Sequence, residues 1–506
     1  MSAVFSYFRH SVAARFLLIC VLAAAIRMAG IGDQSFWTDE VLTLKISPQP
    51  WDQMLASLKN DESCKPPIYY VVMHFLLGKN PDETQARIPS AIFGALSCGV
   101  FLLVGENLWG LRRGWLPAAL LLVSPFALWY SQEARMYSLW LLLDLTTLYF
   151  FLKYRSEHRI SWLLLLAGSA ATSCYTFTYG FFLLAWLGFA ALADADKYET
   201  NTLKRLIAAL LLCLILFLPG LWQMIHLANS ALTQFNRGLV LEAFGFTFFV
   251  LAFGLTLGAT QEQLRLLGTG FFKLHIVETT WMAFLGIAVL FLVFVGIRAI
   301  RKDRNLIGLI LGGLMVFCAG PALVSLLRPN VTYNPRYALV ALIPFLLLLS
   351  AAIPAAIKTR SGLFCLFLFS FGLLASDLNY YFATAYQRDD LRAATSYIVD
   401  RKCSLVLVSA TFSSPVVDYY GKNQLTVLPY PPKDHLIEEL NPAQPLWKQL
   451  KEAGRFAWVY TRPDHWDRQG HFPQWLKENF NILETGHWTG VTVFICTPRQ
   501  PAAPGN

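Results

Sequence analysis

Charged residues are scarce in this chain. They make up 14% of its 506 residues, whereas a soluble globular protein carries about a quarter. Hydrophobic residues account for 56%. This composition excludes an ordinary soluble protein and indicates an integral membrane protein. Only the stretch after about Tyr386 regains the charge density of a soluble domain.

Cysteine motifs are also lacking. The nine cysteines include no CxxC pair and no Cys/His spacing of the kind found in metal sites. Most of them lie inside apolar runs, where cysteine behaves as a small core residue. Cys403 and Cys496 lie in the part expected to be soluble. If that part is extracytoplasmic, the two thiols either form a disulfide or occupy buried strand positions, and the sequence leaves both open.

The chain has no continuous basic face. Its formal net charge is +9, but the basic residues form short clusters between apolar runs. This pattern reflects membrane topology and excludes nucleic acid as a partner. No internal repeat is evident, which disfavours the transporter folds that are built from repeats.

Long apolar stretches are abundant. A membrane-spanning helix needs roughly 17–25 residues, and eleven such stretches occur, at residues 11–31, 86–106, 114–130, 136–153, 160–177, 179–193, 206–226, 279–297, 306–327, 337–357 and 361–379. No small-residue cleavage site precedes Asp33, so the first stretch is expected to remain as a transmembrane helix. The predicted fold class is an α-helical polytopic membrane protein with about eleven transmembrane helices.

The basic clusters predict the orientation of these helices. They lie at residues 9–15, 112–113, 153–159, 197–205, 298–304 and 358–360. Placing all six in the cytoplasm satisfies the positive-inside rule. The amino terminus is then cytoplasmic, and the odd number of crossings puts the region after Tyr386 outside. Two shorter apolar runs, residues 68–78 and 244–259, are interpreted as interfacial or re-entrant pieces, so residues 32–85 form one long outer loop.

A different pattern follows the last apolar stretch. The segments SLVLVSA, FAWVYTR and VTVFICT predict strands, and DHLIEELNPAQPLWKQLKEAG predicts a helix. Strands that alternate with helices indicate a small α/β domain. The expected organisation is a transmembrane domain at residues 1–385, an extracytoplasmic α/β domain at 386–498 and a disordered tail at 499–506.

Two adjacent carboxylates, Asp39 and Glu40, follow the first apolar stretch in FWTDEVLTL. At the point where a helix leaves the bilayer, such groups are costly unless they are solvated or used. One interpretation is that they are solvated charges at a helix end. The other is that one of them deprotonates an acceptor at the membrane surface.

The other outer segments bring ionisable residues of their own, namely Lys65, Arg87, Glu133, Arg135 and Arg336. A single one would be ordinary snorkelling. Their convergence on one side of the membrane favours a site that combines a base with cations able to neutralise a phosphate leaving group. Asp144 lies in mid-helix and is expected to find a structural partner such as Arg27.

Five segments occur in an order and spacing that resemble the family 39 type of membrane glycosyltransferases: FWTDE, KPPIYY, RIPSAIFGAL, SPFALWYSQEARMYSL and NPRYALVALIP. These enzymes have the GT-C fold. They are related to protein O-mannosyltransferases, the aminoarabinose transferase of lipid A, and galacturonosyltransferases that modify lipopolysaccharide. The resemblance is strong over most of residues 30–200 and weaker over the later helices. It implies transfer of a sugar from a polyprenyl phosphate donor to an envelope acceptor, whether lipid, glycan or protein, on the outer face of the membrane.

The resemblance also implies roles for single residues. Asp39 matches the acidic motif and is expected to be the general base, with Glu40 as its neighbour or substitute, so that displacement at the anomeric carbon inverts configuration. Lys65 and Arg135 match basic positions of the family and, with Arg336, are candidates to bind the donor phosphate. The candidates to line the substrate pocket are Tyr69, Tyr70, Glu133 and Tyr137, although the tyrosines also fit an interfacial aromatic belt.

No essential metal or other cofactor is expected, because many relatives carry His where this chain has Lys65, and some carry a carboxylate near the position of Cys64. The resemblance implies a bacterial inner membrane protein whose C-terminal domain is periplasmic or extracellular. Two other functions remain open. A transporter or flippase for a lipid-linked sugar predicts charges near the bilayer midplane, and a membrane scaffold leaves the paired carboxylates without a role.

Overall fold

The computed structural model describes residues 11–60, 66–193, 195, 200–230, 241–260, 263, 267, 270–328, 333–430, 445–467 and 470–499. Contacts between residues divide the chain into two compact units. The first, here called the membrane unit, comprises Met1–Ile31, Ile46–Ala259 and Thr269–Phe382. The second, here called the C-terminal unit, comprises Gly32–Lys45, Thr260–Gly268 and Ala383–Asn506.

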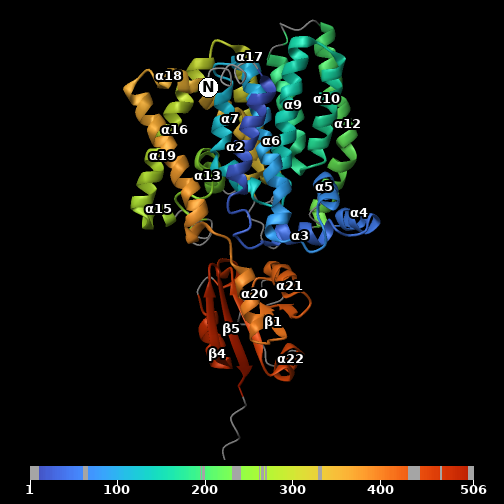
Figure 1. Ribbon diagram of the computed structural model, residues 1–506, viewed down its shortest axis with the longest axis vertical. Coiled ribbons are helices and arrows are strands. Elements are labelled where there is room, and N and C mark those ends of the chain that lie inside the picture. The colour runs from blue at the N-terminus through green and yellow to red at the C-terminus, as the bar shows by residue number, and fades with distance from the viewer. Residues whose placement is uncertain are drawn as a thin grey trace, which may run out of the picture. The chain divides into compact units, whose positions relative to one another are not determined.

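Every secondary-structure element described in the membrane unit is a helix, and its long helices form a bundle (Figure 1). In chain order its elements are α2 (Val12–Met28), α4 (Trp51–Asn60), α5 (Ile68–Leu76), α6 (Glu83–Trp109), α7 (Trp115–Leu122), α8 (Pro125–Ser131), α9 (Tyr137–Glu157), α10 (Ile160–Cys174), η1 (Thr178–Phe181), α11 (Phe182–Ala193), α12 (Thr200–Ser230), α13 (Leu241–Phe253), α15 (Gly270–Leu274), α16 (Ile276–Ile300), α17 (Arg304–Leu327), η3 (Pro335–Ala341), α18 (Leu342–Ala356) and α19 (Arg360–Phe382).

Each of the eleven predicted apolar stretches coincides with one helix or with two consecutive ones. The stretch at 114–130 is divided between α7 and α8, because the Ser124 side chain caps α8 and Pro125 occupies its first turn. The stretch at 337–357 begins as the 3₁₀ turn η3 and continues as α18. The predicted helical membrane class is confirmed.

Six of the described helical segments are long and apolar enough to cross a membrane: Glu83–Trp109, Asn201–Trp222, Ile276–Ile300, Arg304–Leu327, Pro335–Ala356 and Arg360–Phe382. The two shorter runs form α5 and α13, of 9 and 13 residues. At 1.5 Å per residue these helices are about 14 and 20 Å long, short of the ~30 Å hydrocarbon layer. Their lengths agree with the interpretation that neither crosses by itself.

Helix α6 lies inside the bundle and packs against α2, α7, α8 and α9. The approach of α2 and α8 to α6 requires a small residue, because a Cβ on Gly94 would collide with the side chains of Arg27 and Ser131. Farther along the same helix pair, Arg15 and Glu106 form an ion pair with a separation of 2.7 Å. These contacts set the register of α2 on α6.

The expected pairing of Asp144 with Arg27 is wrong. Asp144 on α9 accepts a hydrogen bond from the Ser173 hydroxyl of α10. Arg27 donates to the Ser131 hydroxyl and to the Leu121 carbonyl, at 3.1 Å each. Both charged side chains are fully buried, and each is matched to polar groups of a neighbouring helix, which suits a structural role.

The C-terminal unit combines a sheet with flanking helices. Its elements are α3 (Thr38–Ile46), η4 (Thr384–Tyr386), α20 (Leu391–Asp400), β1 (Leu405–Val408), η5 (Thr411–Ser413), α21 (Ser414–Gly421), β2 (Thr426–Pro429), α22 (Pro445–Ala453), β3 (Phe456–Thr461), α23 (Pro463–Trp466), α24 (Phe472–Asn479), β4 (Phe480–Trp488) and β5 (Val491–Pro498).

The sheet has the strand order β2-β1-β3-β5-β4. Strand β1 is parallel to β2 and β3, whereas β5 runs antiparallel to β3 and β4. The sequences LVLV of β1 and FAWVYT of β3 are buried almost throughout, as expected for strands covered on both faces. The core on one side of the sheet gathers around Trp458, Phe472 and Phe494. The predicted small sheet domain is confirmed.

Prediction of individual elements of this unit succeeds in part. The three predicted strands correspond to β1, β3 and β5. Of the predicted helix, α22 is described, and residues 431–444 lie outside the described residues. Strand β4 is not predicted from the sequence, because Asn481, Glu484 and Gly486, residue types that are depleted in strands, interrupt its apolar residues. Cys403 and Cys496 are buried free thiols, so of the two alternatives the structure has buried positions without a disulfide.

Candidate active site

Asp39 and Glu40 occupy the first turn of α3. The start of a helix has unpaired backbone N–H groups and a partial positive charge, which favour carboxylates there. Glu40 pairs with one of these N–H groups, because its Oε2 accepts a hydrogen bond from the Trp37 backbone N–H at 3.3 Å. The Glu40 side chain is fully buried, whereas Asp39 is partly exposed.

Glu40 also forms an ion pair with Arg388, which precedes α20. The Arg388 Nη1 donates to Glu40 Oε2 at 2.6 Å, and the two side chains are 9% and 0% exposed. A buried carboxylate is tolerated only when it is paired and hydrogen-bonded. The contact therefore gives the buried Glu40 carboxylate a charged partner and fixes its direction.

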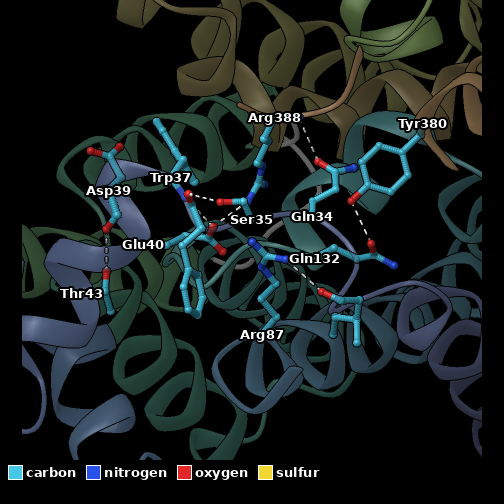
Figure 2. A network of polar contacts seen from close by, with 12 residues as sticks. Gln34, Ser35, Trp37, Asp39, Glu40, Thr43, Arg87, Gln132, Tyr380 and Arg388 are labelled. Atoms are coloured by element: carbon cyan, nitrogen blue, oxygen red, sulfur yellow. Dashed lines mark hydrogen bonds and ion pairs between the residues drawn. The ribbon is translucent and has the colours of Figure 1, made fainter. Parts of the chain in front are cut away.

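The two neighbouring carboxylates have different surroundings. Figure 2 shows the Asp39 carboxylate pointing away from Glu40 and Arg388. The Asp39 backbone carbonyl accepts a hydrogen bond from the Thr43 hydroxyl at 3.1 Å, one turn along α3. The helix thus directs the Glu40 carboxylate to Arg388 and the Asp39 carboxylate away from it.

The segment before α3 is held by polar contacts to α20 and α21. Arg392 donates to the carbonyls of Gly32 and Asp33 at 3.1 and 2.7 Å. The Phe36 N–H donates to the Tyr420 hydroxyl at 2.7 Å, and the two rings stack with centroids 6.1 Å apart. These contacts fix the backbone that leads into α3.

The helix itself is tied to the loop after β1 and to α21. The Thr38 hydroxyl donates to the Phe412 carbonyl at 2.7 Å. Lys45 forms an ion pair with Asp418 at 2.6 Å, with side chains 39% and 46% exposed. Exposed pairs of this kind contribute little free energy, on the order of 0–1 kcal/mol, so the buried contacts of Glu40 and Phe36 carry more of the attachment.

Arg388, Arg392 and Tyr420 are missing from the sequence-based set of site residues. The partners of the Glu40–Arg388 pair are separated by 348 positions, and neither periodicity nor spacing relates residues so far apart. One signal was present. The run QRDDLR gathers four charges just after the last apolar stretch, at the point where a chain leaves the membrane and a charge cluster is informative.

A second group of predicted residues meets in the membrane unit. Arg135 follows α8, is 5% exposed, and donates through Nη1 to the Tyr70 hydroxyl of α5 at 3.2 Å. The Tyr69 hydroxyl hydrogen-bonds the Ser90 hydroxyl of α6 at 3.2 Å, and Ser90 also donates to the Arg135 carbonyl at 3.3 Å. The segments KPPIYY, RIPSAIFGAL and SQEARMY therefore converge.

Arg336 lies beside an aromatic cluster. Its guanidinium is 6.0 Å from the ring centre of Tyr137 and 5.5 Å from that of Tyr337. Tyr137 packs edge-on against Phe177 with centroids 5.4 Å apart, and Tyr179 lies 4.9 Å from Tyr337. Such rings attract a cation. Arg336 and Tyr137, both predicted site residues, are thus brought together.

Glu133 is buried, at 1% exposure, in the turn between α8 and α9. That turn is held by its neighbour Gln132, whose Nε2 donates to the carbonyls of Arg27 and Ala29 at 2.9 and 2.7 Å. The Tyr380 hydroxyl of α19 donates to Gln132 Oε1 at 2.8 Å (Figure 2). The turn that carries Glu133 and Arg135 is therefore fixed by α2 and α19.

Arg87 reaches toward the end of α2. Its Nη1 donates to the Ile31 carbonyl at 3.0 Å, and the side chain is 1% exposed. This contact holds Ile31, which immediately precedes the segment Gly32–Lys45, here called the acidic segment because it carries Asp39 and Glu40. Lys65 lies outside the described residues. Among the described residues no group of three or more His, Cys, Asp or Glu side chains is placed to hold a metal ion.

Part of the chain is similar in sequence to a known protein family. Residues 65–222 match the family model described as dolichyl-phosphate-mannose-protein mannosyltransferase. No curated protein matches the chain.

Solved structures give a likeness over nearly the whole chain. ArnT from Cupriavidus metallidurans, in its complex with undecaprenyl phosphate, is 14% identical, with a TM-score of 0.54 over 95% of this chain and 97% of that chain. The Archaeoglobus fulgidus oligosaccharyltransferase in its apo form is 10% identical, with a TM-score of 0.49 over 88% of this chain and 69% of that chain. The likeness to ArnT establishes the GT-C fold that the ordered motifs predict.

Proposed function

We propose that this PMT-like protein of the GT-C fold is an inverting glycosyltransferase, which moves a sugar from a polyprenyl phosphate donor to an envelope acceptor on the outer face of the membrane. Its family match and its fold are those of glycosyltransferases. The donor class is supported by the mannosyltransferase family model, which names a polyprenyl-type phosphate sugar, and by the undecaprenyl phosphate bound to the similar ArnT structure.

In the proposed reaction Asp39 is the general base. Its carboxylate accepts the proton of the acceptor hydroxyl while the hydroxyl oxygen attacks the anomeric carbon. The bond between that carbon and the phosphate oxygen breaks, and the polyprenyl phosphate leaves with the electron pair. A single displacement of this kind inverts the anomeric configuration.

Arg135 and Arg336 are proposed to bind the donor phosphate, together with Lys65. Both arginines belong to the membrane unit and lie among the tyrosines of the predicted pocket. Guanidinium groups form charge-assisted hydrogen bonds with phosphate oxygens. They also stabilise the charge that develops on the leaving group, so they should contribute to turnover as well as to binding.

The observation that carries the proposal is the contrast within the acidic pair. Glu40 is buried and engaged by Arg388, whereas the carboxylate of Asp39 is partly exposed and points away from that contact (Figure 2). A general base must reach its substrate, and it benefits from a fixed helix beneath it. This contrast supports Asp39 as the base and gives Glu40 a supporting role.

Two measurements test the reaction and its donor. Lipid extracts of a deletion strain, analysed by mass spectrometry, should accumulate a polyprenyl phosphate sugar and contain an under-glycosylated envelope component. The purified protein in nanodiscs, given those extracts as acceptor, should release polyprenyl phosphate from a polyprenyl phosphate sugar. Equal or better use of a nucleotide sugar would contradict the donor assignment. Movement of the lipid-linked sugar across the membrane without its cleavage would identify a transporter or flippase instead.

We further propose that the protein lies in the bacterial inner membrane, with its amino terminus in the cytoplasm and the α/β domain outside. The distribution of the six basic clusters supports this orientation. A phosphatase fused after Pro501 should be active outside, and a fusion active only in the cytoplasm would overturn the orientation. Transfer is proposed to need no metal, so it should survive a chelator.

A further inference from the structure

The edge of the sheet formed by the carboxyl ends of β1 and β3 is the expected ligand site of the C-terminal unit. The chain leaves β1 toward β2 on one side, and β3 lies on the other side. Open α/β sheets bind their ligands at such a point, outside the carboxyl ends of the strands. In this protein the edge contacts a segment of the same chain.

The contacts run from the strand ends to the acidic segment. The Phe412 carbonyl, in the turn η5 that follows β1, accepts the hydrogen bond of Thr38. At the end of β3, Arg462 forms an ion pair with Asp389 at 2.6 Å, and the Thr461 hydroxyl donates to the same carboxylate at 3.4 Å. Asp389 thereby anchors its neighbour Arg388 to the sheet.

Arg388 transmits this anchoring to α3. Its guanidinium holds the buried Glu40 carboxylate at 2.6 Å, and its backbone N–H donates to the Gln34 side chain at 3.3 Å. Glu40 and Asp39 are consecutive on one helical turn, so fixing the direction of the Glu40 side chain fixes the rotation of α3 about its axis. The direction of the Asp39 carboxylate, away from Arg388 (Figure 2), depends on that rotation.

We propose that Arg388 is a positioning residue for the transfer reaction. The sheet of the C-terminal unit uses the edge at β1 and β3 to hold the chain's own acidic segment, and Arg388 orients Asp39 through Glu40. This inference rests on the proposed function, in which Asp39 is the general base. It gives the α/β domain a role in the transfer reaction.

The proposal predicts a particular kinetic effect. Misplacement of a catalytic group by about 1 Å can cost on the order of a hundredfold in rate. Arg388→Gln should therefore lower kcat at least about tenfold while the KM for the lipid donor stays within about twofold, because the donor phosphate is assigned to other arginines. Arg388→Lys keeps the positive charge and should retain more activity than Arg388→Gln.

The matched control is Arg401→Gln. Arg401 forms an ion pair of the same length, 2.6 Å, with Glu484 in the same unit, but its side chain is 33% exposed. Its removal should leave kcat unchanged. Wild-type kcat in Arg388→Gln, or equal losses in Arg388→Gln and Arg401→Gln, would overturn the proposal.

Hydrogen exchange of residues 32–45, measured on the full protein in nanodiscs, separates this inference from the proposed function. Exchange in this segment should be at least about tenfold faster in Arg388→Gln than in the wild type, whereas Arg401→Gln should leave it unchanged. Unchanged exchange in Arg388→Gln would overturn the positioning role even if transfer is confirmed. A wild-type protein that transfers no sugar would overturn the proposed function alone, and the exchange result would still decide whether Arg388 holds the segment.

Discussion

Replacing Arg388 with Met should strongly destabilise the C-terminal unit, because it removes the cation that pairs with the buried Glu40 carboxylate at 2.6 Å. The two side chains are 9% and 0% exposed, so solvent screening offsets little of the loss. Breaking a buried ion pair from one side costs about 3–5 kcal/mol. Replacing both partners with apolar residues of similar size, as in Glu40→Leu with Arg388→Met, is often neutral or stabilising.

Pulse proteolysis over a urea series, detected on the C-terminal unit, would measure these free energies in the full protein. With a slope of about 2 kcal/mol per molar urea, Arg388→Met should lower the midpoint by roughly 2 M. The double variant should recover most of that shift. Arg401→Met is the control, because its pair with Glu484 is screened by solvent and should contribute much less than the buried pair.

Two results would refute this reasoning. If Arg388→Met unfolds at the same urea concentration as Arg401→Met, Glu40 is not held as a buried ion. If the double variant loses as much as the sum of the single variants, the two side chains are not energetically coupled.

Three further predictions concern other contacts. Tyr70→Phe removes the acceptor of the Arg135 hydrogen bond, so the KM for a polyprenyl phosphate sugar should rise about 2- to 10-fold; an unchanged KM would remove Tyr70 from the donor site. The hydrogen bond from Arg401 holds the pKa of Glu484 below its ordinary value, so its stabilising effect is present above pH ~4.5 and is lost as the pH falls through the lowered pKa. Acid unfolding of the C-terminal unit should then be less steep in Glu484→Gln than in the wild type, and identical profiles would contradict this. Burial raises the pKa of Cys403, and that of Cys496 to about 12, so at pH 8 both should react with a maleimide only after unfolding, whereas rapid labelling of the folded protein would contradict their burial.

The helices of the membrane unit were predictable because hydropathy is a local property. A helix that crosses the hydrocarbon layer needs a long apolar stretch, and α6, α16 and α19 stand out in the sequence for that reason. Strand β1 was predictable from its continuous apolar residues. Strand β4 was not, because Asn481, Glu484 and Gly486 interrupt its apolar residues and are residue types depleted in strands.

Only those residues of the candidate site that belong to the sequence motifs were predictable. The structure brings Tyr70 to Arg135 and Tyr137 to Arg336, and all four residues come from the motifs of the sequence. The assignment of Gly32–Lys45 to the C-terminal unit was not predictable, because it depends on Arg388, Arg392 and Tyr420, more than 340 positions away. Such contacts arise from tertiary packing, and a single sequence carries no periodic signal of them.

The role of Asp39 is the central claim, and turnover by Asp39→Asn tests it most directly. The measurement is release of polyprenyl phosphate by the purified variant in nanodiscs, alongside binding of the lipid donor and the matched variant Glu40→Gln. Loss of a general base lowers the rate about 10²- to 10⁴-fold, so Asp39→Asn should lose turnover by this factor while it still binds donor, and Glu40→Gln should lose less. Near-native turnover in Asp39→Asn with an inactive Glu40→Gln would reverse the two roles, and activity in both variants would contradict the account.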